Sequence, residues 1–267
     1  MSYEDSGTLL DYAFCRYGTS KAKFRGPEVE IGNQTVAFVG ASETFGRFSI
    51  SPFPAIVEHI SQRPCANFGQ NGAGIDGFIL DRDVQNMCQR SAITVVQIMG
   101  AQNMSNRLYS VHPRRNDRFI RQSMLMKTIF DDIEFTDFNF VQHMLSTIKN
   151  QAPDRFPIIV QELKAAWVAR MKMMLAQIGG QIILLWVPCK ASPSNVLGTG
   201  PLFVDEAMIA ELAPAVCGVI RPKMSTDPND PSTDGLLYSP FDQAAAALAM
   251  SQAEHQYVAE LLAAELK

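Results

Sequence analysis

The segment TVAFVGASETFGRF, residues 35–48, runs from a short apolar stretch directly into a turn of glycine, alanine and serine. Its first part, 35–39, is apolar and rich in β-branched residues, which is typical of a strand buried on both faces of a parallel sheet. The strand ends at Gly40 and Ala41 and delivers the hydroxyl of Ser42 at the edge of the sheet. In open α/β sheets, ligands bind at this edge, beyond the carboxyl ends of the strands. The segment therefore predicts a parallel sheet with a site at its edge.

The rest of the chain alternates between further apolar runs and helical patterns. The expected strands are residues 35–39, 64–68, 92–98, 181–187 and 215–220. The expected helices are residues 53–63, 76–90, about 156–178 and 204–212. This alternation predicts a parallel sheet of about five strands between two layers of helices, a three-layer α/β/α sandwich of flavodoxin-like type.

Length and composition favour one globular domain. The chain has 267 residues, of which 47% are hydrophobic and 19% charged, and this balance is typical of a packed core. We expect residues 1–267 to form a single domain. Within it, residues 101–153 are too long for a simple connection and are interpreted as an inserted loop with one or two helices. Residues 222–240, rich in Pro, Asp and Ser, predict a surface loop, and residues 241–267 a C-terminal helical tail.

The bulk charge and the cysteines exclude several classes of function. A net charge of −4 argues against a nucleic-acid-binding protein, which would need a broad basic surface. The five cysteines are scattered without CxxC spacing, so neither a disulfide framework nor a metal site is indicated, and no cofactor is expected. The N-terminus resembles no secretory signal and no apolar run reaches the ~20 residues of a membrane span. We expect a cytoplasmic protein; the sequence does not determine its oligomeric state.

Three strands deliver polar groups to the same edge of the predicted sheet. The first ends at Ser42, the second runs into NFGQNGAG (67–74), and the third into GAQNMSN (100–106). A serine hydroxyl, a glycine-rich turn with exposed backbone N–H groups and a side-chain amide should therefore lie close together. Acyl transfer needs this set, because one group attacks the carbonyl and the others stabilise the oxyanion.

This order of blocks resembles the SGNH (GDSL-type) hydrolase superfamily, in a divergent bacterial branch. The resemblance implies that Ser42 is the nucleophile. It also implies that Gly72 and Asn103 form the oxyanion hole together with the backbone N–H of Ser42. His255, at the start of the C-terminal helical pattern, would be the general base. The implied function is a serine hydrolase of esterase type that acts on an O-acyl ester of a carbohydrate or small metabolite.

The motifs depart from the family pattern at several positions. Ala41 stands where the family has aspartate, GAQN has one residue more than the usual spacing to Asn103, and Met104 replaces the next aspartate. Gln252 lies three residues before His255, where an aspartate would orient the imidazole and stabilise its cation. Two alternatives therefore stay open: an O-acyltransferase that uses the same site, and a catalytically silent SGNH-like protein that binds an anionic ligand.

Each candidate residue also has a structural interpretation. Ser42 could cap a helix, and the glycine-rich turn could hold a phosphate, although it lacks both GxGxxG and a Walker lysine. His255 could be a histidine on the surface of a helix. His112, in SVHP, also resembles the family's closing block; its place in the chain order is wrong for the base, but it could still reach the site from the inserted loop.

A basic segment around His112 is the candidate for substrate binding. Arginine binds carboxylate, sulfate or phosphate through paired hydrogen bonds, so this loop would favour an anionic substrate if it folded over the strand ends. The alternative is a solvated or salt-bridged loop. The candidate residues are Arg107, His112, Arg114 and Arg115, in the segment Arg107–Arg118.

Overall fold

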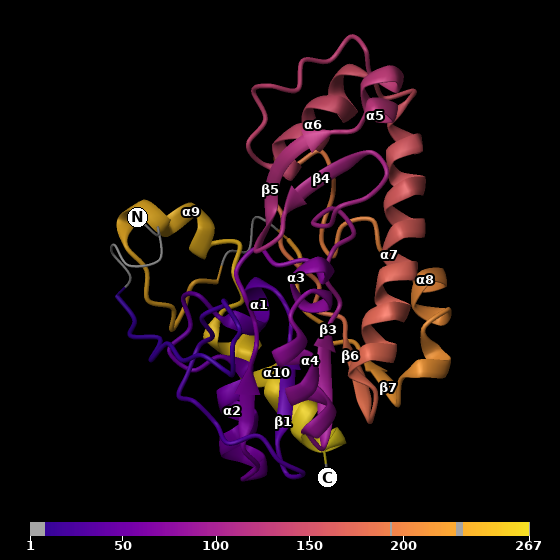
Figure 1. Ribbon diagram of the computed structural model, residues 1–267. Coiled ribbons are helices and arrows are strands. Elements are labelled where there is room, and N and C mark those ends of the chain that lie inside the picture. The colour runs from indigo at the N-terminus through magenta and orange to yellow at the C-terminus, as the bar shows by residue number, and fades with distance from the viewer. Residues whose placement is uncertain (1–8, 193, 228–231, 267) are drawn as a thin grey trace.

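The centre of the molecule is a parallel sheet of five strands in the order β2-β1-β3-β6-β7 (Figure 1). The computed structural model describes residues 9–192, 194–227 and 232–266. The strands are β1 (Val36–Val39), β2 (Cys65–Asn67), β3 (Ile93–Gln97), β6 (Ile182–Leu185) and β7 (Gly218–Ile220). Each of them falls within a run expected from the sequence, and their order is that of flavodoxin-like folds. The predicted fold class is confirmed.

The register of the central strands sets where their polar turns begin. Phe38 of β1 pairs with Asn67 of β2, and Val39 pairs with Val96 of β3. Three neighbouring strands therefore end at nearly the same level. The turns that follow them, which carry Ser42, Gly72 and Asn103, start from one edge of the sheet.

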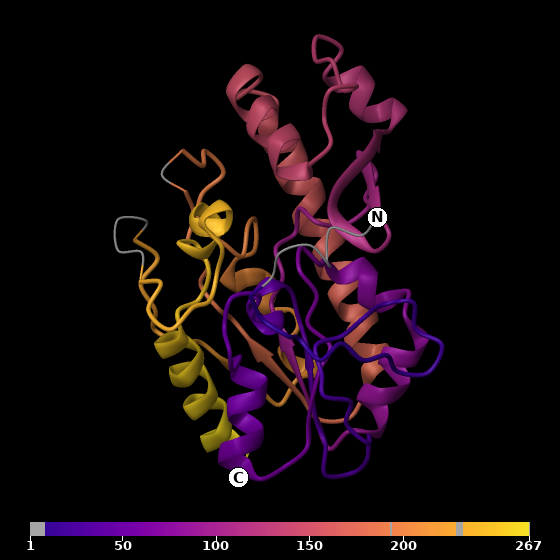
Figure 2. The same cartoon turned by 90° about the vertical axis from the view of Figure 1, so that its left-hand side faces the viewer.

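Helices cover both faces of the sheet and give the three predicted layers (Figure 2). On one face, α2 (Phe53–Ser61) and α10 (Gln252–Glu265) pack against each other and against Val36 and Phe38. On the other face, α7 (Phe156–Ile178) lies with two shorter helices over Ala37 and Val39. These are α3 (Ile75–Ile79) and α4 (Arg82–Arg90). The sequence predicted one helix over 76–90; it is divided because the Asp81 side chain caps α4 by accepting the Val84 N–H.

The inserted segment 101–153 contains a β-hairpin that the sequence did not predict. The hairpin consists of β4 (Tyr109–His112) and β5 (Arg115–Gln122), and α5 (Met124–Ile129) and α6 (Val141–Gln151) follow it. Figure 1 shows this segment rising above the sheet edge, with the hairpin turn lowest and nearest α1 and α3. β5 is rich in charged residues and partly faces solvent, and β4 is only four residues long, so the sequence of the hairpin resembles a loop.

The C-terminal part combines a loop with short helices. After β7, two short helical segments, η2 (Pro240–Asp242) and α9 (Gln243–Ala246), precede α10. Residues 228–231 of the predicted loop 222–240 lie outside the described residues. In the described part of the chain, no helix has the length and apolarity needed to cross a bilayer. The same residues contain no group of three or more His, Cys, Asp or Glu side chains placed to hold a metal ion.

Candidate active site at the sheet edge

The turn that carries Ser42 is held from both ends. Ser42 is exposed and begins the single-turn helix α1 (Ser42–Phe45) directly after β1. The Gln97 Oε1 atom, at the end of β3, accepts hydrogen bonds from the Ala41 N–H at 2.9 Å and the Thr44 hydroxyl at 2.6 Å. At the other end, the buried Arg25 guanidinium donates to the carbonyl of Gly46 at 2.5 Å. The serine therefore sits on a fixed turn.

The structure brings Ser42 together with Gly72 and Asn103, as the sequence predicted. The Gly72 backbone N–H donates to the Ser42 Oγ at 3.2 Å. Gly72 has a φ of +66°, a left-handed conformation that glycine adopts readily. The Asn103 Nδ2 donates to the Gly72 carbonyl at 3.4 Å. A hydroxyl, a backbone N–H and a carboxamide thus lie side by side at the sheet edge.

These three residues line a cavity of about 260 Å³. Other parts of its wall come from α6, through Gln142, and from the loop after β6, through Lys190 and Asn195. Gln102 also lines it, and the buried Oε1 atom of Gln102 has no hydrogen-bond partner among the described residues. A buried acceptor without a partner is rare in folded proteins. Amide side chains and a lysine thus make the cavity wall polar.

The cavity also contains charged residues that the sequence analysis did not single out. Lys190, whose side chain is 5% exposed, lies 3.2 Å from Glu254 in a buried ion pair. Glu43 accepts hydrogen bonds from the Gln97 amide at 2.5 Å and from the Cys189 thiol at 3.4 Å. Burial, together with the neighbouring Glu43 carboxylate, raises the pKa of Cys189 well above its usual value, so the thiol stays protonated. No motif spacing connects these residues, because they follow different strands.

His255 lies in a buried environment beside the end of α1. Its Nδ1 atom accepts a hydrogen bond from the Phe53 backbone N–H at 3.2 Å, and its ring stacks on that of Phe53. A neutral ring with this contact carries its proton on Nε2. Burial, and to a lesser degree the positive charge of Arg25, lowers the pKa of His255 to about 3.

These contacts weigh against His255 as the general base, although its role stays a prediction. A base must accept the serine proton at an unprotonated nitrogen, and its pKa should lie near the working pH. Nor is His255 one of the described residues that line the Ser42 cavity. Gln252 does not take the place of the missing aspartate either, because its side chain has other partners. Its Oε1 accepts a hydrogen bond from the Ser49 hydroxyl at 2.7 Å, and its Nε2 donates to the Ser51 carbonyl at 2.8 Å.

The basic segment 107–118 does not contribute to the cavity wall. Arg107 pairs with Glu162 on α7, with 2.7 Å between Nε and Oε2. Arg114 and Arg115 are exposed, and their backbone N–H groups donate to the His112 Nδ1, each at 3.2 Å. The described residues that line the cavity include none of these four side chains. Their proposed role in substrate binding stays a prediction.

The same hairpin nevertheless reaches the site through Asp117. A Cβ atom on Gly72 would lie 3.0 Å from the Asp117 carboxyl carbon. Burial raises the pKa of Asp117, while nearby Arg118, Arg115 and His112 lower it by smaller amounts. The hairpin therefore places a carboxyl group directly behind the turn that donates to Ser42.

A family model, described as Domain of unknown function (DUF6473), matches residues 1–267 of this chain. The chain belongs to this family. For this member of the DUF6473 family, a search of curated proteins found no match.

Several solved structures are similar to this DUF6473 domain. One, from Desulfitobacterium hafniense DCB-2 and described as a lipolytic protein of the G-D-S-L family, is 14% identical, with a TM-score of 0.39; the match covers 87% of this chain and 99% of that one. A family two carbohydrate esterase from Clostridium thermocellum is 12% identical, with a TM-score of 0.42; the match covers 92% of this chain and 66% of that one. The lipase Lip_vut3 from a goat rumen metagenome is 9% identical, with a TM-score of 0.42; the match covers 86% of this chain and 96% of that one. All three likenesses are distant, with sequence identities of 14% or less.

Proposed function

We propose that this protein is a serine hydrolase of esterase type with Ser42 as its nucleophile. The observation that carries the proposal is the contact between the Ser42 Oγ and the Gly72 N–H, with the Asn103 carboxamide beside it. This group lies in the wall of a polar cavity at the carboxyl ends of parallel strands, where α/β proteins bind ligands.

In the proposed reaction, the Ser42 Oγ attacks the ester carbonyl and loses its proton to a base. The carbonyl oxygen becomes an oxyanion, which the backbone N–H groups of Gly72 and Ser42 and the Asn103 Nδ2 stabilise. The C–O bond to the alcohol then breaks, the alcohol leaves with a proton, and water hydrolyses the acyl-Ser42 ester. A single well-placed oxyanion donor contributes about 3 kcal/mol to lowering the barrier in serine hydrolases.

Two histidines are candidates for the base, and a pair of variants separates them. His255 has the position in the chain that the family resemblance implies, but its Nδ1 contact and low pKa weigh against it. His112 lies on the hairpin whose Asp117 touches Gly72. Its Nδ1 also accepts backbone N–H groups, so that contact would have to open before His112 could act as a base. The histidine whose replacement by alanine abolishes acylation, while the protein stays folded, is the base.

The cavity favours a short acyl group on a hydrophilic alcohol. A volume of about 260 Å³ is small, and its wall carries side-chain amides and a buried lysine. An O-acyl ester of a carbohydrate or small polar metabolite fits this wall better than a lipid ester. This substrate class is part of the proposal.

The test is intact-mass spectrometry after treatment with a fluorophosphonate, comparing wild type with Ser42→Ala. A single adduct in the wild type that disappears in the variant supports an activated serine. An adduct that persists in the variant, or no adduct on folded wild type, overturns the proposal. If the serine reacts, product analysis with a polyol acceptor distinguishes hydrolysis from acyl transfer to a hydroxyl group.

A binding protein without catalysis is the second candidate function. The surroundings of His255 favour it, because its Nδ1 atom accepts the Phe53 N–H and a buried imidazole whose pKa is lowered to about 3 is only a weak base. Absence of the adduct on folded wild-type protein would select this alternative. Calorimetric titration with small anions and polyols would then identify the ligand class.

A further inference from the structure

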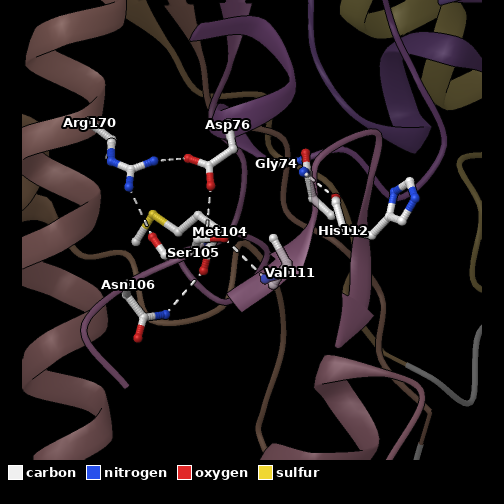
Figure 3. A network of polar contacts seen from close by, with 9 residues as sticks. Gly74, Asp76, Met104, Ser105, Asn106, Val111, His112 and Arg170 are labelled. Carbon is white, nitrogen blue, oxygen red and sulfur yellow. Dashed lines mark hydrogen bonds and ion pairs between the residues drawn. The ribbon is translucent and has the colours of Figure 1, made fainter. Parts of the chain in front are cut away.

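A buried polar network beside the cavity connects the turns that carry Gly72 and Asn103 (Figure 3). The Asp76 side chain is 7% exposed and lies in the first turn of α3, four residues after Gly72. Its Oδ2 atom accepts the Ser105 backbone N–H at 2.8 Å, and Ser105 is two residues after Asn103. One carboxylate thus links the two segments that supply the proposed oxyanion donors.

Arg170, on α7, contacts both partners of this hydrogen bond. Its guanidinium forms an ion pair with the Asp76 Oδ1 and donates to the Ser105 carbonyl at 3.1 Å. Arg170 therefore binds both the carboxylate and the backbone that the carboxylate holds. Figure 3 shows Asp76, Arg170 and Ser105 in contact with one another, with the His112 ring directed away from this network. An ion pair with this geometry fixes two loops against a long helix.

The two turns also touch each other directly. A Cβ atom on Gly74 would lie 1.7 Å from the Asn103 carbonyl oxygen, so only glycine permits this approach. The Gly74 N–H donates at 2.8 Å to the Oδ1 of Asn116, a buried hairpin residue. A shift of Asp76 would therefore move Gly74 and Asn103 relative to each other.

We infer that Asp76, held by Arg170, is a positioning residue that sets the geometry between the Gly72 N–H and the Asn103 carboxamide. This inference rests on the proposed function, because it assigns both groups to an oxyanion hole. Oxyanion donors act only when they are aimed at the place where charge develops, so a small displacement costs rate rather than substrate binding. Asp76 itself touches neither substrate nor Ser42 in this mechanism.

The matched control is Glu162, a second buried carboxylate against the same loop. Glu162 lies on α7, accepts the Arg107 backbone N–H at 3.1 Å and pairs with the Arg107 guanidinium. It resembles Asp76 in burial and in its type of partner, but it holds residue 107 rather than the backbone beside Asn103. Loss of stability alone should affect Asp76→Asn and Glu162→Gln in the same way.

The experiment compares wild type, Asp76→Asn and Glu162→Gln at a temperature where all three are folded. The rate at which the fluorophosphonate phosphonylates Ser42, with loss of fluoride, should fall by at least about tenfold in Asp76→Asn, as expected for a misplaced oxyanion donor, and stay at the wild-type value in Glu162→Gln. For a reporter ester, kcat should fall while KM stays unchanged. Equal phosphonylation rates in the two variants would overturn the inference. If Asp76→Asn does not fold, Arg170→Met replaces it, and Arg170→Lys should restore part of the rate.

Hydrogen exchange of the backbone amides provides a second test, which does not depend on catalytic activity. In Asp76→Asn, exchange should accelerate in residues 70–74 and 100–106; in Glu162→Gln, only around residue 107. A wild type that does not react with the fluorophosphonate removes the proposed function, and the exchange pattern still decides whether Asp76 orders the two turns. Unchanged exchange in both segments would refute the positioning role.

Discussion

The backbone N–H of Gly72 lies 3.2 Å from the hydroxyl oxygen of Ser42, although these residues belong to different strand-end turns. Gly72 reaches this position in a left-handed conformation with the Asp117 carboxyl group behind it. The contact joins the first two strands of the sheet at the point where the proposed reaction takes place. Its geometry depends on a glycine that no other residue type replaces without strain.

Replacement of Gly72 by alanine should lower acylation of Ser42 strongly. The new Cβ would lie 3.0 Å from the Asp117 carboxyl carbon in a strained left-handed residue, so the turn or the Asp117 side chain must shift and the N–H is no longer aimed at the same place. Loss of one oxyanion donor typically lowers the rate by about 100- to 1000-fold. The measurement is the rate of fluorophosphonate labelling followed by intact mass.

The control for this variant is Gly179→Ala. Gly179 also has a left-handed φ, of +60°, but a Cβ there would meet nothing within 4 Å. Because its ψ of −169° lies in a region that is essentially restricted to glycine, this variant should lose about 1–3 kcal/mol of stability through backbone strain and keep its labelling unchanged. Similar labelling losses in both variants would mean that strain, not the donor, explains the effect.

Replacement of Gln97 by glutamate should destabilise the protein at neutral pH. The Gln97 amide nitrogen donates to Glu43 at 2.5 Å, so the substitution places two carboxylates face to face in a buried site. We expect a loss of about 2–4 kcal/mol in the free energy of unfolding at pH 7. The folded state would bind a shared proton more tightly than the unfolded state, so the loss relative to wild type should shrink by pH 5.

Urea unfolding at pH 7 and pH 5 tests the Gln97→Glu prediction. The control is Gln89→Glu, because the Gln89 amide donates to the Gln177 carbonyl at 2.7 Å in an exposed contact. That variant should lose much less stability. A loss for Gln97→Glu that does not depend on pH would show that repulsion from Glu43 is not its cause.

The buried His255 should make the protein less stable in acid. Its pKa falls from 6.5 to about 3 on folding, so below pH 6.5 the unfolded state binds a proton that the folded state does not. The stabilisation is therefore complete above pH 6.5 and is lost as the pH falls towards 3. The slope from this one group is about 1.4 kcal/mol per pH unit.

Chemical unfolding of wild type and His255→Gln between pH 7 and pH 4 measures this slope. The variant should lose less stability than wild type over this range, whatever its stability at pH 7. His59→Gln, which removes an exposed histidine from α2, should keep the wild-type dependence on pH. Parallel curves for wild type and His255→Gln would show that His255 is protonated when the protein is folded.

The cysteines should differ in their reaction with a disulfide reagent at neutral pH. Cys217 is exposed, whereas Cys65 and Cys88 are buried with pKa values raised to about 12. Burial also raises the pKa of Cys189, in the cavity wall, well above its usual value. Reaction requires the thiolate, so the fast phase should disappear in Cys217→Ser, and Cys65, Cys88 and Cys189 should react after unfolding. Fast labelling of Cys189 in the folded protein would contradict this prediction.

Local patterns in the sequence predicted the sheet and one group of the site. Buried strands such as β1 need an unbroken apolar run, and the turn after each strand needs glycine or small polar residues. Because parallel strands end at one edge, chain order alone placed Ser42, Gly72 and Asn103 together. The hairpin β4–β5 was missed because β4 is only four residues long and β5 is rich in charged residues without a clear apolar alternation.

The burial, hydrogen-bond partners and pKa of each side chain in the site depend on the tertiary structure. His255 has the sequence context of a catalytic base, but the packing of α10 against α2 buries it and places the Phe53 N–H on its Nδ1. Lys190 and Asp76 belong to no recognisable sequence motif. Lys190 pairs with Glu254 and Asp76 with Arg170, and each partner is distant in the chain. Secondary structure follows short-range patterns that a sequence displays directly. Burial, hydrogen-bond partners and pKa values depend on contacts between distant segments, and these exist only once the chain has folded.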